Sequence, residues 1–463
     1  MLIGRWFIRV FLIFVPLSLL CVFSLFQTTV EKERSSSVGT LEEERGPQVE
    51  LEFWNTWVHN EPWQEIIFER MKSFEKVHPE IKLHMVAIPH DEYKIKVKAA
   101  AAGRELPDLL VVWPGAEMRP LVAGRSLSPI DEIVDNYKDK LIPANKLMDY
   151  AVGGKQYAIP TVVNFTSIIY YDKALLMNKG YPHFPETYGE MKQLLIRLRN
   201  DGKIPIALGN KAKWVLQSCY LSTIGSRYTG DKFLAEAIRG ERSFTDPEFV
   251  SALRLIEELN KMGAFNDNMN SLDNNQQDDL FIEGKSAMVI DGSWALPKIS
   301  QKFQGLLGLA AFPAVSGGSG SATSLSGVTG QGIAVNADLS PAKKAAALQF
   351  IQYINNEITY KKLLQSQILV PANIPVPRYV DPVFKEMFEL TSRGIAPVYD
   401  AVLPSDLIDT MNKLLQDMTT RKGFGPEQVA QVLQSKMDEI RKGQFDSTTS
   451  DNNPNVAKKE EAP

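Results

Sequence analysis

The sequence predicts an α/β protein built from doubly wound sheets in two lobes. In residues 49–113, short apolar stretches of strand type alternate with stretches of helical periodicity, in the order strand, helix, strand, helix, strand. A similar alternation begins again after residue 150. The 463 residues are 44% hydrophobic and 23% charged, an ordinary globular balance with enough length for more than one domain. We therefore expect two α/β lobes, with the chain crossing between them more than once.

The first α/β unit follows from local patterns. Asn60 and Pro62 begin the first helix as a cap and a first-turn proline, and Asp91 is expected to cap a second helix that Gly103 ends. The last strand is uniformly apolar, as in a buried parallel strand. The three strands lie at residues 49–54, 81–88 and 109–113.

The second series of elements has the same signals. Asp246 and Pro247 begin a helix with apolar residues at helical spacing, and Ser340 with Pro341 begins another. The expected strands are short and are the stretches KQYAIP (155–160), TSIIYYD (166–172), KIPIALG (203–209), SAMVID (286–291) and GIAVNAD (332–338).

Composition and motifs argue against several classes of protein. A net charge of −4 gives no basis for a nucleic-acid surface. Cys21 and Cys219 make no disulfide framework, and the five histidines lack the spacing of metal ligands. Residues 266–279 are rich in Asp and Asn, but Met269 interrupts the order of a calcium loop, so we expect a solvated loop and a helix start. No G-x-S-x-G or H-E-x-x-H motif is present, and we expect no catalysis, metal or cofactor.

The N-terminus is typical of an export signal. Arg5 and Arg9 precede an uncharged apolar run at residues 10–26, which is at the short edge of a spanning length. We expect residues 1–30 to form a signal or membrane anchor. An uncleaved anchor is favoured over lipidation at Cys21, whose preceding Leu is bulky, and over cleavage and release. Residues 31–47 are predicted to be a polar tether, and residues 444–463 a disordered tail.

The tryptophans mark a candidate site. In an open α/β sheet, ligands bind beyond the carboxyl ends of the strands. Outside the anchor, every tryptophan is on or next to a predicted strand exit: Trp54, Trp57, Trp63, Trp113, Trp214 and Trp294. Trp63 lies on the apolar face of the first helix and is expected to be core. Alternation also predicts that Trp54 and Trp57 point to different faces.

Four motifs, in order along the chain, resemble those of a known family. They are PDLLVVWPG (107–115), GGKQYAIPTVVNFTSIIYYDKALL (153–176), FIEGKSAMVIDGSW (281–294) and GQGIAVNADLSPAKKAAALQFIQYI (330–354). With these motifs the chain resembles the extracellular solute-binding proteins of ABC importers, family 1, of the maltose- and oligosaccharide-binding type. The resemblance covers about residues 48–440, and the usual lipidation signal is the part that departs from the pattern.

The resemblance implies two α/β lobes joined by a hinge, periplasmic-binding-protein-like of type II, with the ligand in the cleft between them. By analogy, lobe one is residues 48–162 plus 313–355, and lobe two is residues 163–312 plus 356–443. It also implies a monomer that captures a solute, most naturally a sugar, and delivers it to membrane permease subunits with a cytoplasmic ATPase.

Stacking and hydrogen bonding define the expected site. A tryptophan face stacks on the C–H face of a sugar, and amides or carboxylates bind its hydroxyls. Trp294, freed by the preceding Gly292 and Ser293, is the first candidate platform, and Asp291 either accepts from a hydroxyl or caps the next helix. The full set is Trp54, Trp57, Trp113, Asn164, Trp214, Asp291, Trp294 and Gln331. Open alternatives are another solute (polyamine, iron complex, peptide or phosphorylated glycerol) and a sensor that partners a membrane histidine kinase.

Overall fold

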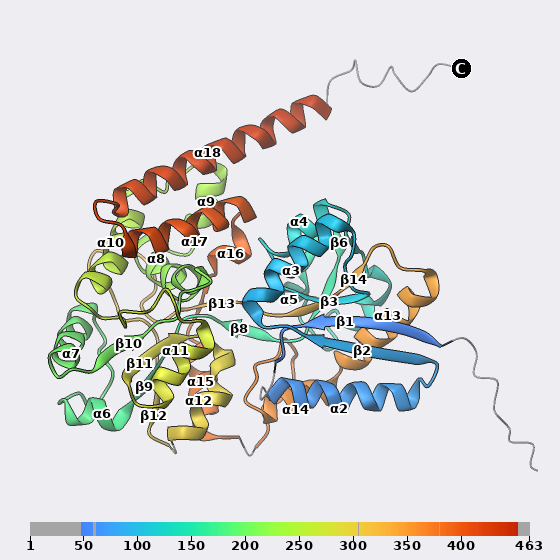
Figure 1. The fold of residues 1–463 in the computed structure, drawn as a ribbon, viewed down its shortest axis with the longest axis horizontal. Helices are drawn as coiled ribbons and strands as arrows, with labels where there is room; N and C mark the ends of the chain where they lie inside the picture. Colours follow the sequence, from blue (N-terminus) through green and yellow to red (C-terminus); the bar gives the residue numbers. More distant parts are fainter. Residues whose placement is uncertain (1–47, 59–61, 304, 379, 452–463) are drawn as a thin grey trace, which may run out of the picture. The chain divides into compact units, whose positions relative to one another are not determined.

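The computed structural model describes residues 48–58, 62–303, 305–378 and 380–451 (Figure 1). The predicted anchor, the lipidation site at Cys21 and the tether lie outside the described residues. Within the described ranges, no helix has both the length and the apolar character needed to cross a membrane. The last helix runs to Asp451, into the segment that the sequence predicts to be disordered.

Lobe one is built on a sheet with the strand order β2-β1-β3-β14-β4, and β7 also pairs with β14. The strands β1, β2 and β3 run parallel, as predicted, whereas β14 enters from much later in the chain and is antiparallel to β3. The strands are β1 (Val49–Asn55), β2 (Ile81–Ala87), β3 (Leu109–Val112), β4 (Leu127–Ser128), β7 (Ala158–Pro160) and β14 (Gly332–Asn336). The lobe-one helices are α2 (Pro62–Val77), α3 (His90–Gly103), α4 (Met118–Ala123), α5 (Ala144–Met148), α13 (Pro341–Ile354) and α14 (Glu357–Gln365), with η1 (Asp131–Asn136) and the hairpin β5 (Ala151–Val152) and β6 (Lys155–Gln156).

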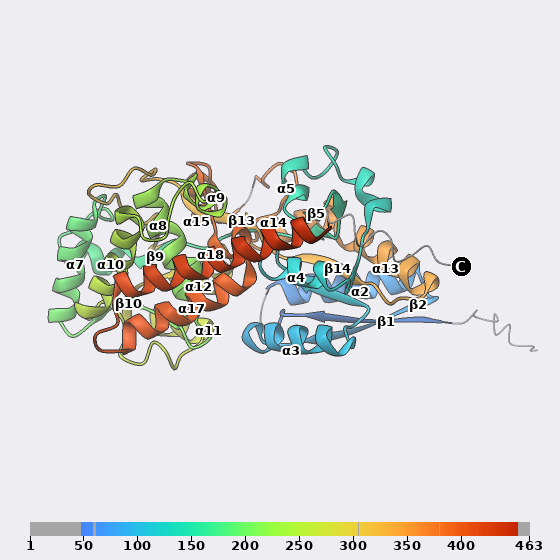
Figure 2. The ribbon, with the colours of Figure 1, turned by 90° about the horizontal axis from the view of Figure 1, so that it is seen from above.

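Alternation along β1 decides which side chains enter each half of the lobe-one core. Phe53 packs edge-on against Phe350 of α13, with ring centroids 5.7 Å apart. The ring of Trp54 lies under the ammonium of Lys96 on α3, at 4.0 Å. Trp57 is on the side of Phe53, with ring centroids 5.6 Å apart. The prediction that Trp54 and Trp57 point to different faces is confirmed, and the sheet lies between α3 and the α2–α13 layer (Figure 2).

Lobe two has a mixed sheet in place of a purely parallel one. Its order is β10-β11-β9-β12, in which only β10 and β11 run parallel. The strands are β9 (Ile168–Asp172), β10 (Ile204–Ala207), β11 (Ser286–Asp291) and β12 (Leu307–Ala310). The surrounding helices are α6 (Lys173–Asn178), α7 (Tyr188–Asn200), the π-helix η2 (Leu216–Leu221), α8 (Ser222–Thr229), α9 (Phe233–Arg239), α10 (Pro247–Lys261), α11 (Asn274–Ile282), η3 (Ser293–Ala295), α12 (Leu296–Phe303), α15 (Pro382–Thr391), α16 (Tyr399–Val402), α17 (Ser405–Thr420) and α18 (Pro426–Asp451).

A third sheet carries the chain between the lobes (Figure 1). It has three strands in the order β15-β13-β8, which are β8 (Val163–Phe165), β13 (Leu325–Thr329) and β15 (Ile395–Pro397). β8 directly follows β7 of lobe one, and β13 directly precedes β14 of the same lobe. We call this the hinge sheet.

Two crossings come later in the chain than the family analogy predicts. Residues 313–324, assigned to lobe one, are tied to lobe two by Arg227, whose buried guanidinium donates to the carbonyls of Phe312 and Ser324 at 3.0 and 2.7 Å. Helix α14, assigned to lobe two, packs on α2 of lobe one, where Arg70 Nε donates to Thr359 Oγ1 at 2.9 Å. Both segments are helical or loop-like by local pattern, and only distant contacts decide their lobe.

Candidate binding site at the strand exits

Three of the predicted tryptophans meet although they come from separate stretches of the chain. Trp113 ends β3 of lobe one, whereas Trp214 and Trp294 follow β10 and β11 of lobe two. The ring centroids of Trp214 and Trp294 are 6.1 Å apart. His90 lies between the lobes, with its ring centroid 5.2 Å from that of Trp113 and 5.2 Å from that of Trp214. We call these four side chains, all partly exposed, the aromatic cluster.

His90 was missed by the sequence analysis, which tested histidines only as metal ligands. The residue is the first of α3 and follows the exit of β2, the same kind of position that marked the tryptophans. Burial, assisted by the nearby Lys94 charge, lowers the pKa of His90, so its ring is neutral at physiological pH. A neutral ring packs against two indoles without the cost of burying a charge.

Asp91 does not cap α3 as predicted. The N-cap position is Pro89, and it makes no side-chain cap hydrogen bond. The carboxylate of Asp91 instead accepts a hydrogen bond from Trp214 Nε1 across the lobes, at 3.2 Å. Burial opposes ionisation, but contacts with His90 and Trp214 hold the pKa of Asp91 below its usual value. Asp91 is therefore a charged acceptor beside the aromatic cluster.

More polar groups surround Trp113. The ammonium of Lys94 lies 5.4 Å from the Trp113 ring centroid and pairs with Glu117 at 3.1 Å. Burial lowers the pKa of Lys94, but Glu117 and Asp400 outweigh it and raise the pKa. Burial also raises the pKa of Asp400, which belongs to α16 of lobe two. This corner thus holds three carboxylates, including Asp91, around one lysine.

The two lobes touch directly next to the cluster. Ala116 N donates to the carbonyl of Asp400 at 2.8 Å. Gly115 has φ +76°, and a Cβ there would lie 2.4 Å from the carbonyl oxygen of Ala401, so only glycine fits. Further out, Lys98 of α3 pairs with Asp409 of α17 at 3.1 Å. These contacts join the two lobes beside the aromatic cluster.

The other predicted residues lie apart from the cluster. Trp54 and Trp57 are only 7% and 2% exposed, within the lobe-one core, and neither offers an open ring face. Trp57 Nε1 donates to Gln331 Oε1 at 2.6 Å, and Gln331 Nε2 donates to Thr56 Oγ1 at 3.1 Å. Asn164 is a buried residue of hinge strand β8. The side chain of Trp63 lies outside the described residues.

Asp291 corrects the expectation that its carboxylate faces a solute or caps a helix. Its side chain is fully buried. One oxygen accepts from the N–H of Gly292 at 2.7 Å, and the other accepts from Asn274 Nδ2 at 3.1 Å. Gly292, not Asp291, is the N-cap of the short helix η3. The sequence signal is ambiguous because a buried strand end and an exposed one look alike.

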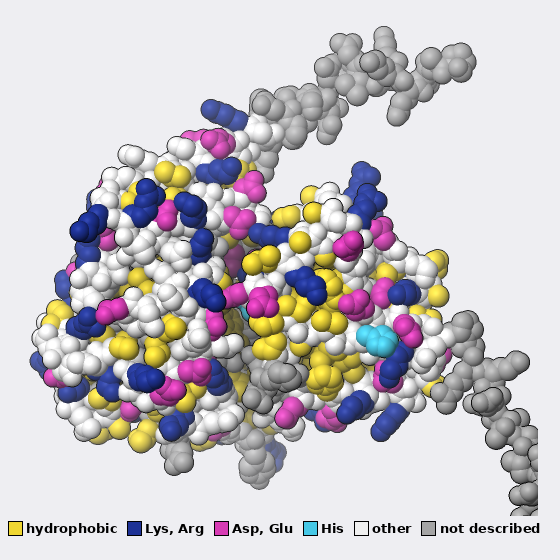
Figure 3. All heavy atoms as spheres, in the orientation of Figure 1, with side chains coloured by type: hydrophobic (Ala, Val, Ile, Leu, Met, Phe, Trp, Pro, Cys, Tyr) yellow, Lys and Arg dark blue, Asp and Glu magenta, His cyan; other side chains and the backbone are white. Residues whose placement is uncertain are grey.

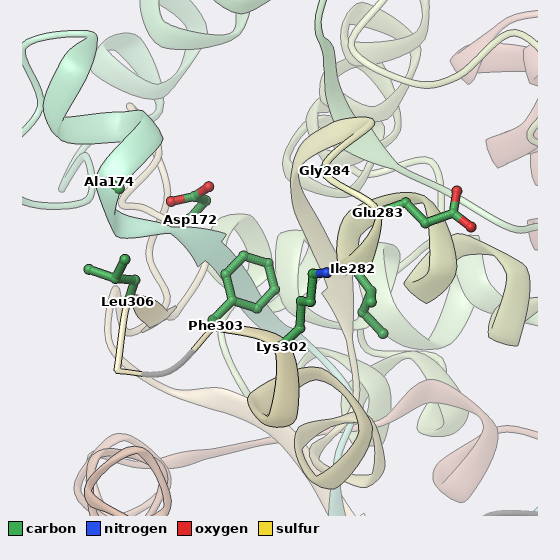
Figure 4. Close-up of a pocket in the computed structure, with 8 residues that line it drawn as sticks. All are labelled: Asp172, Ala174, Ile282, Glu283, Gly284, Lys302, Phe303 and Leu306. Atoms are coloured by element: carbon green, nitrogen blue, oxygen red, sulfur yellow. The ribbon is translucent and has the colours of Figure 1, made fainter.

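A small pocket of about 20 Å³ is lined by Trp113 of the cluster together with Lys94 and Glu117, whereas a larger one lies away from it. A pocket of about 280 Å³ lies on lobe two beside the end of α12, where Phe303, Asp172 and Lys302 line it (Figure 4), and it contains none of the predicted site residues. Lysine, arginine and acidic side chains are interspersed over both lobes on the face in Figure 3. Among the described residues, no three His, Cys, Asp or Glu side chains are grouped so as to hold a metal ion.

Comparisons with known proteins agree with the fold. The model of the family "bacterial extracellular solute-binding protein" matches residues 69–387, more than half of the chain. An uncharacterised ABC transporter extracellular-binding protein of Pyrococcus horikoshii is 25% identical over 253 residues, 53% of this chain and 56% of that protein. The multiple sugar-binding protein of Streptococcus mutans is 24% identical over 277 residues, 54% and 59% of the two chains.

The chain thus spans a little more than half the length of these curated relatives. The solved structure of a chitin oligosaccharide binding protein shares the fold, with a TM-score of 0.78 and 21% identity over 85% of this chain and 99% of that one. The fold predicted from the sequence is therefore confirmed, and so is the family to which its four motifs pointed. The chain belongs to the bacterial extracellular solute-binding proteins.

Proposed function

We propose that this protein is the extracytoplasmic receptor of an ABC importer, and that it captures a sugar or oligosaccharide and releases it unaltered to a membrane permease. The observation that carries the proposal is the aromatic cluster, in which rings from both lobes converge beside a charged acceptor. The sugar-related names of the Streptococcus relative and of the chitin oligosaccharide binding protein support this class of solute.

The interactions of such a site are strong enough for capture without covalent chemistry. An aromatic stack contributes about 0.5–1.5 kcal/mol, and a hydrogen bond to a charged group about 1.5–3 kcal/mol. Two stacks and three or four such bonds offset the cost of ordering and reach about −8 kcal/mol, which is micromolar binding. The site therefore needs only indole faces and a few acceptors.

The charges near the cluster disfavour an anionic solute and favour a neutral or cationic one. Lys94 is paired with Glu117, and Asp91 and Asp400 add further negative charge. A phosphate or carboxylate solute entering here meets more acidic than basic groups, and each unpaired buried charge is costly. A sugar hydroxyl, in contrast, can donate to Asp91 directly.

The cross-lobe hydrogen bond indicates how a sugar stabilises closure. Trp214 Nε1 and the Asp91 carboxylate come from different lobes and satisfy each other in this structure. A hydroxyl group placed between them can accept from the indole and donate to the carboxylate. The one hydrogen bond between the two side chains is then replaced by two hydrogen bonds to the solute. Binding then favours the closed form through its differential affinity for the two lobe arrangements.

A thermal-shift screen of the protein from residue 48 against a panel of sugars tests the proposal. A sugar at 100 times its Kd adds about 2.7 kcal/mol to the free energy of unfolding, which raises the melting temperature. Chromatography of the incubated sugars should return them unchanged. The proposal fails if no neutral sugar shifts the melting temperature while a polyamine, peptide or glycerol phosphate does, or if the sugar is cleaved.

We also propose that residues 10–26 tether the receptor to the outer face of the membrane as an uncleaved anchor. The basic residues before this run and its apolar composition support the orientation. Mass spectrometry of the protein from its native membrane decides among the three fates. An intact Met1 end supports the anchor, whereas a lipid on Cys21 or a shortened N-terminus contradicts it.

A further inference from the structure

The turn that presents Trp294 is held from several sides. The carboxylate of Asp291 accepts from the N–H of Gly292 at 2.7 Å, and the hydroxyl of Tyr170 on β9 donates to the carbonyl of Gly292 at 2.8 Å. Ser293 Oγ accepts from the N–H of Phe165 in the hinge sheet at 3.2 Å. A Cβ on Gly292 would lie 2.1 Å from the Trp294 ring, so the indole covers this glycine. The platform is thus fixed by its neighbours before any solute arrives.

Behind this turn lie two buried carboxylates. Asp291 is fully buried, and Asp278 is 2% exposed. Helix α11 carries Asn274 and Asp278 one turn apart and packs against β11. Asn274 Nδ2 donates to Asp291 Oδ2 at 3.1 Å. Asp278 interacts with the same carboxylate, and its buried Oδ1 accepts no hydrogen bond from the described residues. Because both acids are buried, a solute at the surface does not contact either of them.

The pair has little compensating positive charge. The only cation near Asp278 among the described residues is Lys298, with its Nζ 4.0 Å from Asp278 Oδ2. Lys298 is closer to the exposed Asp279, at 2.8 Å, and donates to the carbonyl of Asn275 as well. Two carboxylates that share a buried site without a close cation cannot both be ionised.

The proton resides on Asp278. Burial and the charge of Asp291 raise the pKa of Asp278 well above its usual value. Burial raises the pKa of Asp291 only to about 6, because Asn274 and the Gly292 N–H bind its ionised form. Asp278 is then a donor and Asp291 an acceptor, which satisfies both without two buried charges.

The other titratable groups that face the pair are neutral near pH 7. They are Tyr170 on β9 and Cys219 and Tyr220 on the π-helix η2, and burial raises the pKa of each. Lys298 on α12 and Asp279 on α11 are charged, exposed partners of one another. A proton-linked change between pH 4 and pH 7 at this place therefore belongs to the two acids.

We propose that Asp278 and Asp291 share one proton and act as positioning residues, in which the Asp291 carboxylate fixes the turn that presents Trp294. This inference rests on the proposed function only in assigning the turn to a sugar platform. The pair itself is a property of lobe two.

The proposal gives stability a definite pH dependence. The folded pair retains a proton that unfolded aspartates lose above about pH 4. Because the folded state binds more protons, this contribution to stability is complete below that pH and is lost as pH rises through the raised pKa of each acid of the pair. The decline contributed by one proton is up to tenfold in the folding equilibrium constant per pH unit.

The experiment compares three full-length variants with the unmodified protein. Asp278→Asn supplies a permanent donor to Asp291 and removes the proton that Asp278 holds, so it should reduce the decline of stability with pH while leaving Trp294 in place. Asp291→Asn leaves one acceptor oxygen for several donors, and should displace Trp294 and weaken maltotriose binding at least tenfold. Asp279→Asn, which changes the exposed neighbour, should retain the decline and the Trp294 environment.

The measurements are urea unfolding from pH 4 to 8, the indole N–H resonance of Trp294 (assigned with Trp294→Phe) and calorimetric titration with maltotriose. An undiminished decline in Asp278→Asn, or a Trp294 resonance unchanged in Asp291→Asn, overturns the proposal. If Asp291→Asn does not fold, the pH dependence of the unfolding free energy of Asp278→Asn decides alone. If no sugar binds, the proposed function fails. The pH dependence of the unfolding free energy and the Trp294 indole resonance still test the proposal about the two acids.

Discussion

The tryptophans after β1 and those after β3, β10 and β11 occupy similar places in sequence but different places in the molecule. Trp54 and Trp57 are sealed in the lobe-one core, one under Lys96 and the other against Phe53. Trp113, Trp214 and Trp294 stay partly exposed and meet around His90. A strand exit brings a side chain to the edge of a sheet, but the segments that cover that edge decide whether it can meet a solute.

The largest expected effect is on stability, at Trp57. Trp57→Ala removes a large, 2% exposed side chain and leaves Gln331 without its donor, so it should cost about 3–5 kcal/mol of unfolding free energy. Urea unfolding monitored by circular dichroism measures this loss. A stability equal to that of the unmodified protein would mean that Trp57 does not belong to the lobe-one core.

The opposite pattern is expected at Trp294. Trp294→Ala should lower the affinity by roughly tenfold through the lost stack, which cuts the stabilisation by a sugar at 100 times the original Kd from about 2.7 to about 1.4 kcal/mol, while the sugar-free protein stays folded. Trp214→Phe gives a second test within the cluster, since it keeps one aromatic ring but loses the indole N–H and part of the ring area. An undiminished shift in Trp294→Ala would remove this residue from the site.

A smaller effect is expected at Asp91. Asp91→Asn keeps an oxygen that can accept from Trp214 but removes the charge that strengthens bonds to sugar hydroxyls, so affinity should fall by about tenfold, or about 1.4 kcal/mol. Glu92→Gln, next to it and exposed, should have no effect. Calorimetric titration compares the two. Equal affinities would show that Asp91 serves only the contact between the lobes.

The smallest effect is expected at the outer cross-lobe pair. Lys98 and Asp409 are both more than half exposed, so their coupling should be about 0.2–1 kcal/mol in a double-mutant cycle and should shrink in high salt. Sugar affinity should weaken by less than about fivefold in either alanine variant. A larger, salt-insensitive coupling would mean that the Lys98–Asp409 pair, and not the aromatic cluster, supplies most of the free energy that holds the lobes together.

Local patterns were sufficient for most elements. The strands β1, β2, β3 and β14, the start of α13 at Ser340 and Pro341, and the exits that carry Trp113, Trp214 and Trp294 follow from periodicity and capping residues. The sequence does not determine that these three tryptophans meet, because the general rule places ligands at strand exits without saying which exits lie together.

What the sequence did not reveal depends on contacts between distant segments. The lobe of α14 is decided by Arg70 and Thr359, nearly three hundred residues apart. The burial of Asp291 depends on Asn274 and Asp278 from another element. His90 follows the exit of β2 as the tryptophans follow theirs, but histidine as a residue type is typical of metal ligands and does not indicate a sugar platform.

The central claim is that three indoles from two lobes grip one sugar, and their N–H resonances test it most directly. In a titration of the ¹⁵N-labelled protein with a sugar that raises its melting temperature, the resonances of Trp113, Trp214 and Trp294 should move together at one Kd, while those of Trp54 and Trp57 stay in place. A sugar that binds and moves Trp54 or Trp57, but leaves the three cluster indoles unchanged, would contradict the account.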